Sequence, residues 1–193
     1  MQERLWRCGV LATGALFAVG CAGTRTKPTS NQQPAAPVAH PDQAVEGGTM
    51  TQVNLTPEEA KRLLDSGSYV YLDVRTIPEY EAGRPPGAWN VPVVEPDASG
   101  KMSQNEGFLE TVKANFRPDQ RIIVGCRSGG RSSMATQMLS RAGFTRVYNM
   151  MGGFGGGKSP NGEDVSGWSE LDFPIESGPD AKRGYEQLRA TSK

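Results

Sequence analysis

The fold is decided by residues 122–132, which read Ile122-Ile123-Val124-Gly125-Cys126-Arg127-Ser128-Gly129-Gly130-Arg131-Ser132. The short, continuous apolar run at the start of this stretch predicts a strand that is covered on both faces, as in a parallel sheet. The glycines that follow predict a tight loop. Apolar residues at helical spacing over 131–142 then predict a helix. A strand, a short loop and a helix in this order indicate an α/β protein.

Outward from this stretch, predicted strands and helices alternate. Residues Thr56-Pro57-Glu58-Glu59 carry the signature of a helix start, with Thr56 as N-cap and Glu59 closing a capping box. The alternation predicts a mostly parallel sheet of about five strands flanked by helices on both faces. The expected strands are 69–74, 88–91, 121–125 and 146–150, and the expected helices are 57–66, 77–82, 106–116 and 131–142. Residues 95–105 are expected to form an exposed loop. In the helix over 131–142, we expect Met134, Met138 and Leu139 to face inward.

The start of the chain predicts an export signal. Arg4 and Arg7 precede an apolar run over 10–19 that is too short for a bilayer, which needs about 20 apolar residues. The run stops at Cys21 in a sequence that resembles the lipid-attachment site of bacterial lipoproteins, although Ala18 stands where that site prefers Leu. We expect a signal peptide over 1–20, a lipidated Cys21 with a flexible tether over 21–49, a domain over 50–178 and a C-terminal tail over 179–193.

These segments predict a domain anchored in the bacterial cell envelope and facing the periplasm. The lipid on Cys21 would be its contact with the membrane, and Ala22 after it favours the outer membrane over the inner one. An ordinary signal peptide that is cut near the same place, or an uncleaved anchor, is the alternative interpretation.

The composition excludes several classes of function. Basic and acidic residues number 21 each, so we expect no nucleic-acid partner. The single histidine, His40, lies in the predicted tether, and the three cysteines, Cys8, Cys21 and Cys126, show no metal-ligand spacing. We therefore expect no metal, no other cofactor and no Cys-His hydrolase. After cleavage and lipidation, Cys126 would be the one free thiol.

The loop that begins at Cys126 carries the expected chemistry. It follows the carboxyl end of a strand, where sites form in parallel sheets. Its glycines let several backbone amides turn towards one point, and the start of the next helix adds partial positive charge. Such surroundings favour a thiolate without a histidine base, so Cys126 is the expected nucleophile. The expected ligands of an anionic substrate are Arg127, Ser128, Gly129, Gly130, Arg131 and Ser132.

A small anion with a transferable outer sulfur, such as thiosulfate, fits this loop. Attack by Cys126 would give a persulfide and release sulfite. A thiol, cyanide or a protein acceptor would then take the sulfur.

Residues 126–132 resemble the active-site loop of single-domain rhodaneses. The resemblance covers about 50–178 and implies a rhodanese-like α/β domain with sulfurtransferase activity. Other motifs agree with it in order along the chain: Leu72-Asp73-Val74-Arg75, Glu79-Tyr80, Gly83-Arg84-Pro85-Pro86-Gly87-Ala88-Trp89-Asn90-Val91-Pro92, Gly143-Phe144, Met151-Gly152-Gly153-Phe154, Trp168 and Pro174.

The resemblance also implies roles near the loop. Asp73 and Arg75 are expected to form a structural ion pair at the sheet edge. Arg84 stands where the family usually has histidine, and we expect it to contact Asp73 or Glu79. The stretch 155–167 is longer than the family's usual ending, and we expect it to shape the rim of the pocket.

Two other functions stay open on the sequence. The loop between Cys126 and Arg131 is one residue shorter than in protein tyrosine phosphatases and rhodanese-fold phosphatases, which favours sulfur transfer over phosphatase or arsenate reductase activity. A non-catalytic persulfide carrier, or a module that senses sulfur or oxidants, is the main alternative, because the chain offers no resolving cysteine beside Cys126.

Overall fold

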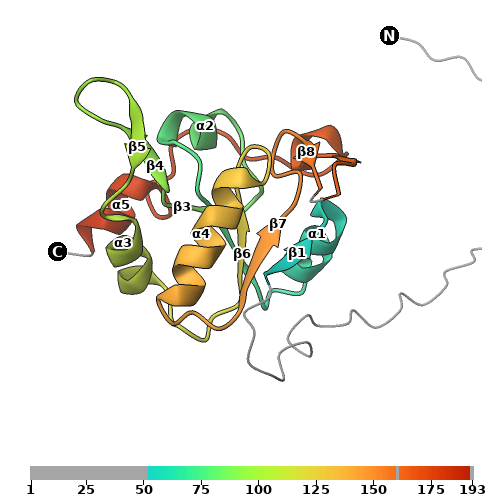
Figure 1. The fold of residues 1–193 in the computed structure, drawn as a ribbon, viewed down its shortest axis with the longest axis horizontal. Helices are drawn as coiled ribbons and strands as arrows, with labels where there is room; N and C mark the ends of the chain where they lie inside the picture. The colour runs from blue at the N-terminus through green and yellow to red at the C-terminus, as the bar shows by residue number, and fades with distance from the viewer. Residues whose placement is uncertain (1–51, 160, 192–193) are drawn as a thin grey trace, which may run out of the picture. The chain divides into compact units, whose positions relative to one another are not determined.

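The computed structural model describes residues 52–159 and 161–191. At its centre is a five-stranded sheet in the order β1-β7-β6-β2-β3, and every neighbouring pair in it is parallel (Figure 1). The predicted α/β architecture is confirmed. The strands are β1 (Val53–Leu55), β2 (Val70–Asp73), β3 (Trp89–Asn90), β6 (Ile122–Gly125) and β7 (Val147–Met150).

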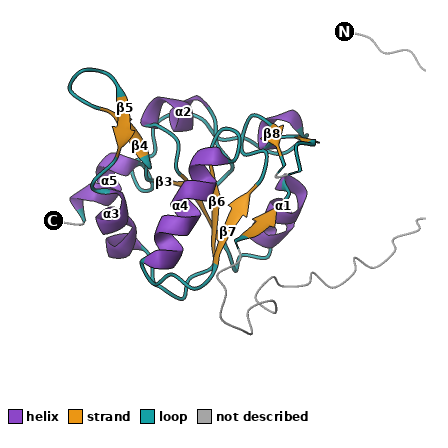
Figure 2. Ribbon diagram, viewed as in Figure 1, coloured by secondary structure: helices purple, strands orange, loops and turns teal. Residues whose placement is uncertain are grey.

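Helices cover both faces of this sheet, as Figure 2 shows. Two clusters of buried apolar side chains, one on each face, hold the helices against the strands. All four residues of β6 are buried, which agrees with a central strand covered on both sides. One face carries α3 (Phe108–Asn115), α4 (Gly130–Arg141) and α5 (Tyr185–Ala190); the other carries α1 (Pro57–Asp65), α2 (Ile77–Ala82) and the 3₁₀ helix η2 (Trp168–Glu170).

Helix α1 begins where the capping residues predict. The Glu59 amide donates to Thr56 Oγ1 at 3.3 Å, and the Thr56 amide donates to Glu59 Oε2 at 2.8 Å. The reciprocal bonds satisfy two amides at the start of the helix that have no partner within it. Ala60 and Leu63 then bury the apolar face of α1.

Three expectations about the elements are wrong. Residues 95–105 contain an antiparallel hairpin, β4 (Val94–Pro96) with β5 (Met102–Gln104), where a plain loop was expected. Met134 is 37% exposed, because the buried face of α4 passes through Ser132, Ala135, Thr136 and Leu139. The expected tail over 179–193 contains α5, whose Tyr185 and Leu188 are buried.

The docking of α5 has a clear physical basis. Tyr185 and Leu188 are three positions apart, so they lie on one helix face, and both join the apolar cluster that contains α3. The Asn105 side-chain amide donates to the Tyr185 hydroxyl at 2.8 Å, which satisfies the buried phenol. The folded unit therefore extends beyond residue 178.

The predictions for the N-terminal region concern residues outside those that the structure describes. They include the signal peptide, Cys21, the tether and His40. In the described part of the chain, no helix has the length and apolar character needed to span a membrane.

Candidate active site

Cys126 follows the carboxyl end of β6, and α4 begins four positions later at Gly130. The chain makes this sharp turn through Gly129, whose φ of 100° lies in the left-handed region. Residues with a Cβ rarely adopt this conformation, so a glycine is required at this point. The turn brings the start of α4 back towards the end of β6.

The sulfur of Cys126 accepts a hydrogen bond from the backbone. The Gly129 amide lies 3.1 Å from Sγ, and the Ser132 hydroxyl oxygen lies 3.4 Å from it. The same hydroxyl is 3.0 Å from the Gly129 carbonyl, so its single proton serves one of the two acceptors at a time. Both donors and the N-terminus of α4 stabilise negative charge on Sγ.

The thiol is nevertheless almost inaccessible, since Cys126 is only 1% exposed. Arg127 and Ser128 are exposed on the outer side of the same loop, and Gly130 is exposed at the start of α4. The structure thus brings the predicted nucleophile and its amide donor together beneath a loop whose polar side chains face solvent.

Arg131, a predicted substrate ligand, is engaged elsewhere. Its Nη1 and Nη2 each donate to one carboxylate oxygen of Glu79 at 2.7 Å. These bonds lower the pKa of Glu79 from 4.5 to about 2. A direct contact between Arg131 and a bound anion would require this ion pair to open, so its role as ligand stays a prediction.

The expected ion pair between Asp73 and Arg75 is confirmed. Arg75 Nη2 lies 2.6 Å from Asp73 Oδ2, and both side chains are buried. Arg75 also donates to the Gly83 carbonyl at 2.6 Å and stacks on the Phe154 ring at 4.3 Å. A buried pair with its remaining hydrogen bonds satisfied fixes the edge of the sheet beside the loop.

The expected contact of Arg84 with Asp73 or Glu79 is wrong. Arg84 is 4% exposed, and it donates to the Gly178 carbonyl at 2.6 Å. Its Nε and Nη2 each lie 3.9 Å from a carboxylate oxygen, of Glu176 and Asp180 respectively. The side chain turns away from the loop because the C-terminal segment passes over it. Arg84 and Glu176 form an isolated antiparallel bridge, which sequence patterns do not predict.

The glycine-rich segment 152–157 holds the loop in place, a contact that the sequence analysis did not predict. The Phe154 amide donates to the Cys126 carbonyl at 2.7 Å, and the Gly155 amide donates to the Arg127 carbonyl at 2.8 Å. A Cβ on Gly153 would overlap the Cys126 carbonyl oxygen, so only glycine permits this approach. The density of glycines in 152–157 was the available signal.

The long stretch after this segment lies against the same loop. It contains a two-stranded hairpin, β8 (Gly157–Lys158) with β9 (Asp164–Val165). A Cβ on Gly157 would overlap the Ser128 carbonyl, which places the start of the hairpin against the loop. The stretch therefore lies beside the loop, and its role in shaping the rim of a pocket stays a prediction.

Tyr71 is a second residue that the sequence analysis missed. Its ring passes beneath Gly125, where a Cβ would overlap the hydroxyl. The residue is 1% exposed, and its hydroxyl has no hydrogen-bond partner among the described residues. Burial raises the pKa of Tyr71 well above its usual value, so the phenol stays protonated. Its place in a strand made it look like an ordinary core residue.

No group of three or more His, Cys, Asp or Glu side chains suited to a metal ion occurs in residues 52–159 and 161–191. At Cys126 the structure places a thiol, two hydrogen-bond donors and the N-terminus of α4.

The fold and the site together define an α/β protein with a buried cysteine in the loop between the central strand β6 and helix α4. The chain belongs to the family of proteins with a rhodanese-like domain, whose family model matches residues 56–159. The structural expectation drawn from the loop motif is thereby confirmed.

Named relatives agree with this family. Thiosulfate sulfurtransferase 16, a chloroplastic protein of Arabidopsis thaliana, is 52% identical over 84 residues, which cover 44% of this chain and 69% of the relative. Senescence-associated protein DIN1 of Raphanus sativus is 39% identical over 120 residues, and the match covers 62% of this chain and 59% of that protein. The chain thus spans less than two thirds of the radish protein.

Bacterial proteins match over more of their own length. Thiosulfate sulfurtransferase GlpE of Glaesserella parasuis serovar 5 is 29% identical over 128 residues, covering 66% of this chain and 96% of the relative. The crystal structure of Rv0390 from M. tuberculosis superposes with a TM-score of 0.54 at 28% identity, over 66% of this chain and 100% of that one.

Proposed function

We propose that this chain is a thiosulfate sulfurtransferase that carries sulfane sulfur on Cys126. The proposal rests on the 3.1 Å hydrogen bond from the Gly129 amide to Cys126 Sγ, at the start of α4. An amide aimed at the sulfur stabilises negative charge where a nucleophile needs it. The thiosulfate sulfurtransferases among the relatives support this reaction class.

The reaction proceeds in two displacements. The Cys126 thiolate attacks the outer sulfur of thiosulfate, a bond forms between Sγ and that sulfur, and sulfite leaves with the electron pair of the broken sulfur–sulfur bond. A thiolate, cyanide or a protein acceptor then attacks the outer sulfur of the persulfide. The Cys126 thiolate is the leaving group of this second step, so no cofactor is consumed.

The neighbouring residues assist both displacements. The Gly129 amide and the Ser132 hydroxyl hold the negative charge of Sγ when the thiolate attacks and when it leaves. The exposed guanidinium of Arg127 attracts the anionic donor to the outer side of the loop.

Access to the sulfur requires local opening. Cys126 is 1% exposed, and the hydrogen bonds from Phe154 and Gly155 hold its loop. We propose that the loop separates briefly from the glycine-rich segment to admit the donor, because openings of this kind cost less than global unfolding.

A thiosulfate:cyanide assay on the full chain tests the reaction, with thiocyanate as the measured product. Cys126→Ala abolishes turnover in this account, and Arg127→Gln raises KM for thiosulfate with less effect on kcat. Thiocyanate formation by Cys126→Ala at the wild-type rate would rule out the Cys126 mechanism.

A non-catalytic persulfide carrier or a sensor of sulfur or oxidants is the second candidate, and the burial of Cys126 favours it. A sulfur atom stored beneath the loop would be protected from small nucleophiles. Stable addition of sulfur without thiocyanate production would support the carrier over the enzyme.

We also propose that the chain works at the bacterial cell envelope, attached through lipid on Cys21 and facing the periplasm. The apolar run that stops at this cysteine supports the proposal. Incorporation of labelled palmitate in a bacterial host, lost in Cys21→Ala, tests it; equal labelling of the two chains would contradict it.

A further inference from the structure

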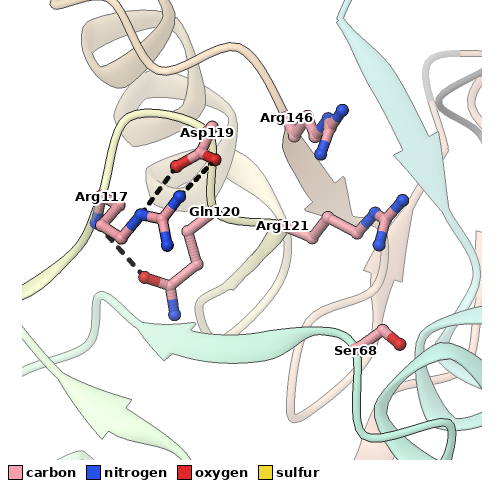
Figure 3. Close-up of a pocket in the computed structure, with 6 residues that line it drawn as sticks. All are labelled: Ser68, Arg117, Asp119, Gln120, Arg121 and Arg146. Atoms are coloured by element: carbon pink, nitrogen blue, oxygen red, sulfur yellow. Dashed lines mark hydrogen bonds and ion pairs between the residues drawn. The ribbon is translucent and has the colours of Figure 1, made fainter.

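Tyr71 places a hydroxyl group beneath the loop that carries Cys126. Strands β2 and β6 pair so that Asp73, two positions after Tyr71, lies opposite Gly125. A Cβ on Gly125 would overlap the Tyr71 hydroxyl, so the ring leans along β2 to the level of Gly125. Tyr71 therefore points to the end of the strands that Cys126 follows, away from the hollow where β2, β6 and β7 begin (Figure 3).

The hydroxyl makes no hydrogen bond in this arrangement. Tyr71 is 1% exposed, and its hydroxyl has no partner within residues 52–159 and 161–191. A buried hydroxyl without a partner destabilises a protein, and phenylalanine would fill the same space without that cost. Tyr80 shows the ordinary arrangement, because its buried hydroxyl donates to the Ala88 carbonyl at 2.7 Å. The structure therefore gives the Tyr71 hydroxyl no role while the loop is held in place.

The hydroxyl lies on the side of the sheet from which the loop is held. Tyr71 and Trp168 belong to the same apolar cluster, and their ring centroids are 6.3 Å apart. The Trp168 amide donates to the Gly153 carbonyl at 2.9 Å, and a Cβ on Gly153 would overlap the Cys126 carbonyl oxygen. The Cys126 carbonyl thus faces the same layer as Tyr71, one residue beyond Gly125.

This carbonyl loses its partner if the loop opens. In the closed form, which the structure shows, it accepts from the Phe154 amide at 2.7 Å. Opening of the loop breaks that bond, and a buried carbonyl without a donor is costly. A second donor close to the carbonyl would stabilise the open form. The Tyr71 phenol keeps its proton for this purpose, because burial raises its pKa well above the usual value.

We propose that Tyr71 is a positioning residue, whose hydroxyl donates to the Cys126 carbonyl when the loop opens and so favours the form in which Sγ is accessible. The inference rests on the proposed sulfur transfer at Cys126, because that reaction requires the opening. Tyr71 contacts neither the sulfur donor nor the transferred sulfur. It acts through the backbone of Cys126, by replacing the hydrogen bond that Phe154 gives up.

Two tyrosine variants test the proposal, because their hydroxyl groups differ in one respect. Tyr71→Phe removes a hydroxyl without a partner among the described residues, whereas Tyr80→Phe removes one that donates to Ala88. Both changes are made in the full chain. Cys8→Ala and Cys21→Ala accompany them in every sample, so that a single thiol remains.

Three measurements follow the loop and the stability of the domain. Hydrogen exchange of the Phe154 and Gly155 amides reports how often the loop separates from the glycine-rich segment, since these amides hold the closed form. The rate of alkylation of Cys126 by iodoacetamide reports access to the sulfur. Denaturant unfolding gives the free energy of unfolding.

Tyr71→Phe should slow both the amide exchange and the alkylation by about fivefold, the effect of one hydrogen bond, without lowering the free energy of unfolding. A purely structural role for the hydroxyl would not slow either rate. Tyr80→Phe should show the opposite pattern, with a lower free energy of unfolding and both rates close to those of the wild type.

Exchange and alkylation of Tyr71→Phe at or above the wild-type rates would overturn the proposal. So would a loss of stability as large as that of Tyr80→Phe, because the Tyr71 hydroxyl would then have a partner in the closed form. Failure of the proposed function is seen separately, as a wild-type chain that forms no thiocyanate from thiosulfate and cyanide. Slower exchange in Tyr71→Phe would still support the hydrogen bond in that case.

Discussion

Glu79 on α2 and Arg131 on α4 are joined by two hydrogen bonds of 2.7 Å, one from each terminal guanidinium nitrogen. Arg131 stands in the first turn of α4, where a positive charge is disfavoured by the helix dipole. The Glu79 carboxylate offsets that cost. The pair ties the helix after β2 to the helix that supplies the Gly129 turn, so it stabilises the geometry around Cys126.

This pair predicts a specific loss of stability in acid. The pKa of Glu79 is about 2 in the folded chain, below its ordinary value of 4.5, so the stabilisation is fully present above 4.5 and is lost as pH falls through about 2. We expect the free energy of unfolding to fall by about 1–2 kcal/mol over this window, after allowance for partial exposure of the pair. Glu79→Gln keeps a capping side chain for Thr76 and should lack this part of the pH dependence.

Denaturant unfolding at several pH values between 2 and 5 gives the free energy of unfolding of the wild type and of Glu79→Gln, and the two pH profiles are then compared. Parallel pH profiles for the two chains would mean that the ion pair contributes nothing.

The two glycines at the start of α4 should respond differently to alanine. Gly129 has a φ of 100°, so Gly129→Ala should cost about 1–2 kcal/mol and slow sulfur uptake by moving the amide that faces Sγ. A Cβ on Gly130 would meet no atom within 4 Å, so Gly130→Ala should fold and react as the wild type does. The two alanine variants are compared by thermal unfolding and by single-turnover sulfur uptake. Equal effects of Gly129→Ala and Gly130→Ala would refute the assigned role of Gly129.

Gly125 and Tyr71 should show strong energetic coupling. Gly125→Ala places a methyl group on the Tyr71 hydroxyl and ring, so we expect a loss of about 2–4 kcal/mol. Tyr71→Phe alone removes a buried hydroxyl without a partner among the described residues and should be nearly neutral in stability. The double variant Gly125→Ala with Tyr71→Ala should lose less free energy of unfolding than the sum of the losses in Gly125→Ala alone and Tyr71→Ala alone. Simple additivity in this double-mutant cycle would contradict the predicted overlap.

Arg84 should hold the C-terminal segment onto the domain. Arg84→Ala removes the buried group that faces Glu176, Asp180 and the Gly178 carbonyl, and we expect a loss of about 2–3 kcal/mol with faster proteolysis near α5. Lys158→Ala, which breaks an exposed ion pair with Asp164, is the control and should change stability by less than about 1 kcal/mol. Unchanged proteolysis of Arg84→Ala would show that α5 is held by its apolar contacts alone.

Local sequence patterns predicted much of the fold. The run Ile122-Ile123-Val124 is apolar without interruption, and it predicts strand β6. Thr56 and Glu59 form a capping box, and it predicts the start of helix α1. The placement of Cys126 at the end of a strand followed in the same way. Each of these features depends on residues within a few positions of one another.

The features that sequence analysis missed depend on distant contacts. Helix α5 has only two buried side chains, too few for a periodic signal, and its position depends on α3 and on Asn105. The partner of Arg131 is on another helix, 52 positions away in the chain. Gly153 acts through a backbone approach to Cys126, and the density of glycines around it does not say which part of the chain it approaches. Such contacts become visible only when the chain is folded.

The most direct test of the account is the intact mass of the chain after exposure to thiosulfate and removal of the excess. A background of Cys8→Ala and Cys21→Ala leaves Cys126 as the only thiol. We predict a gain of one sulfur atom, which cyanide removes as thiocyanate and which Cys126→Ser abolishes. An unchanged mass, with the Cys126 thiol intact and the domain folded, would contradict the claim that this sulfur accepts another.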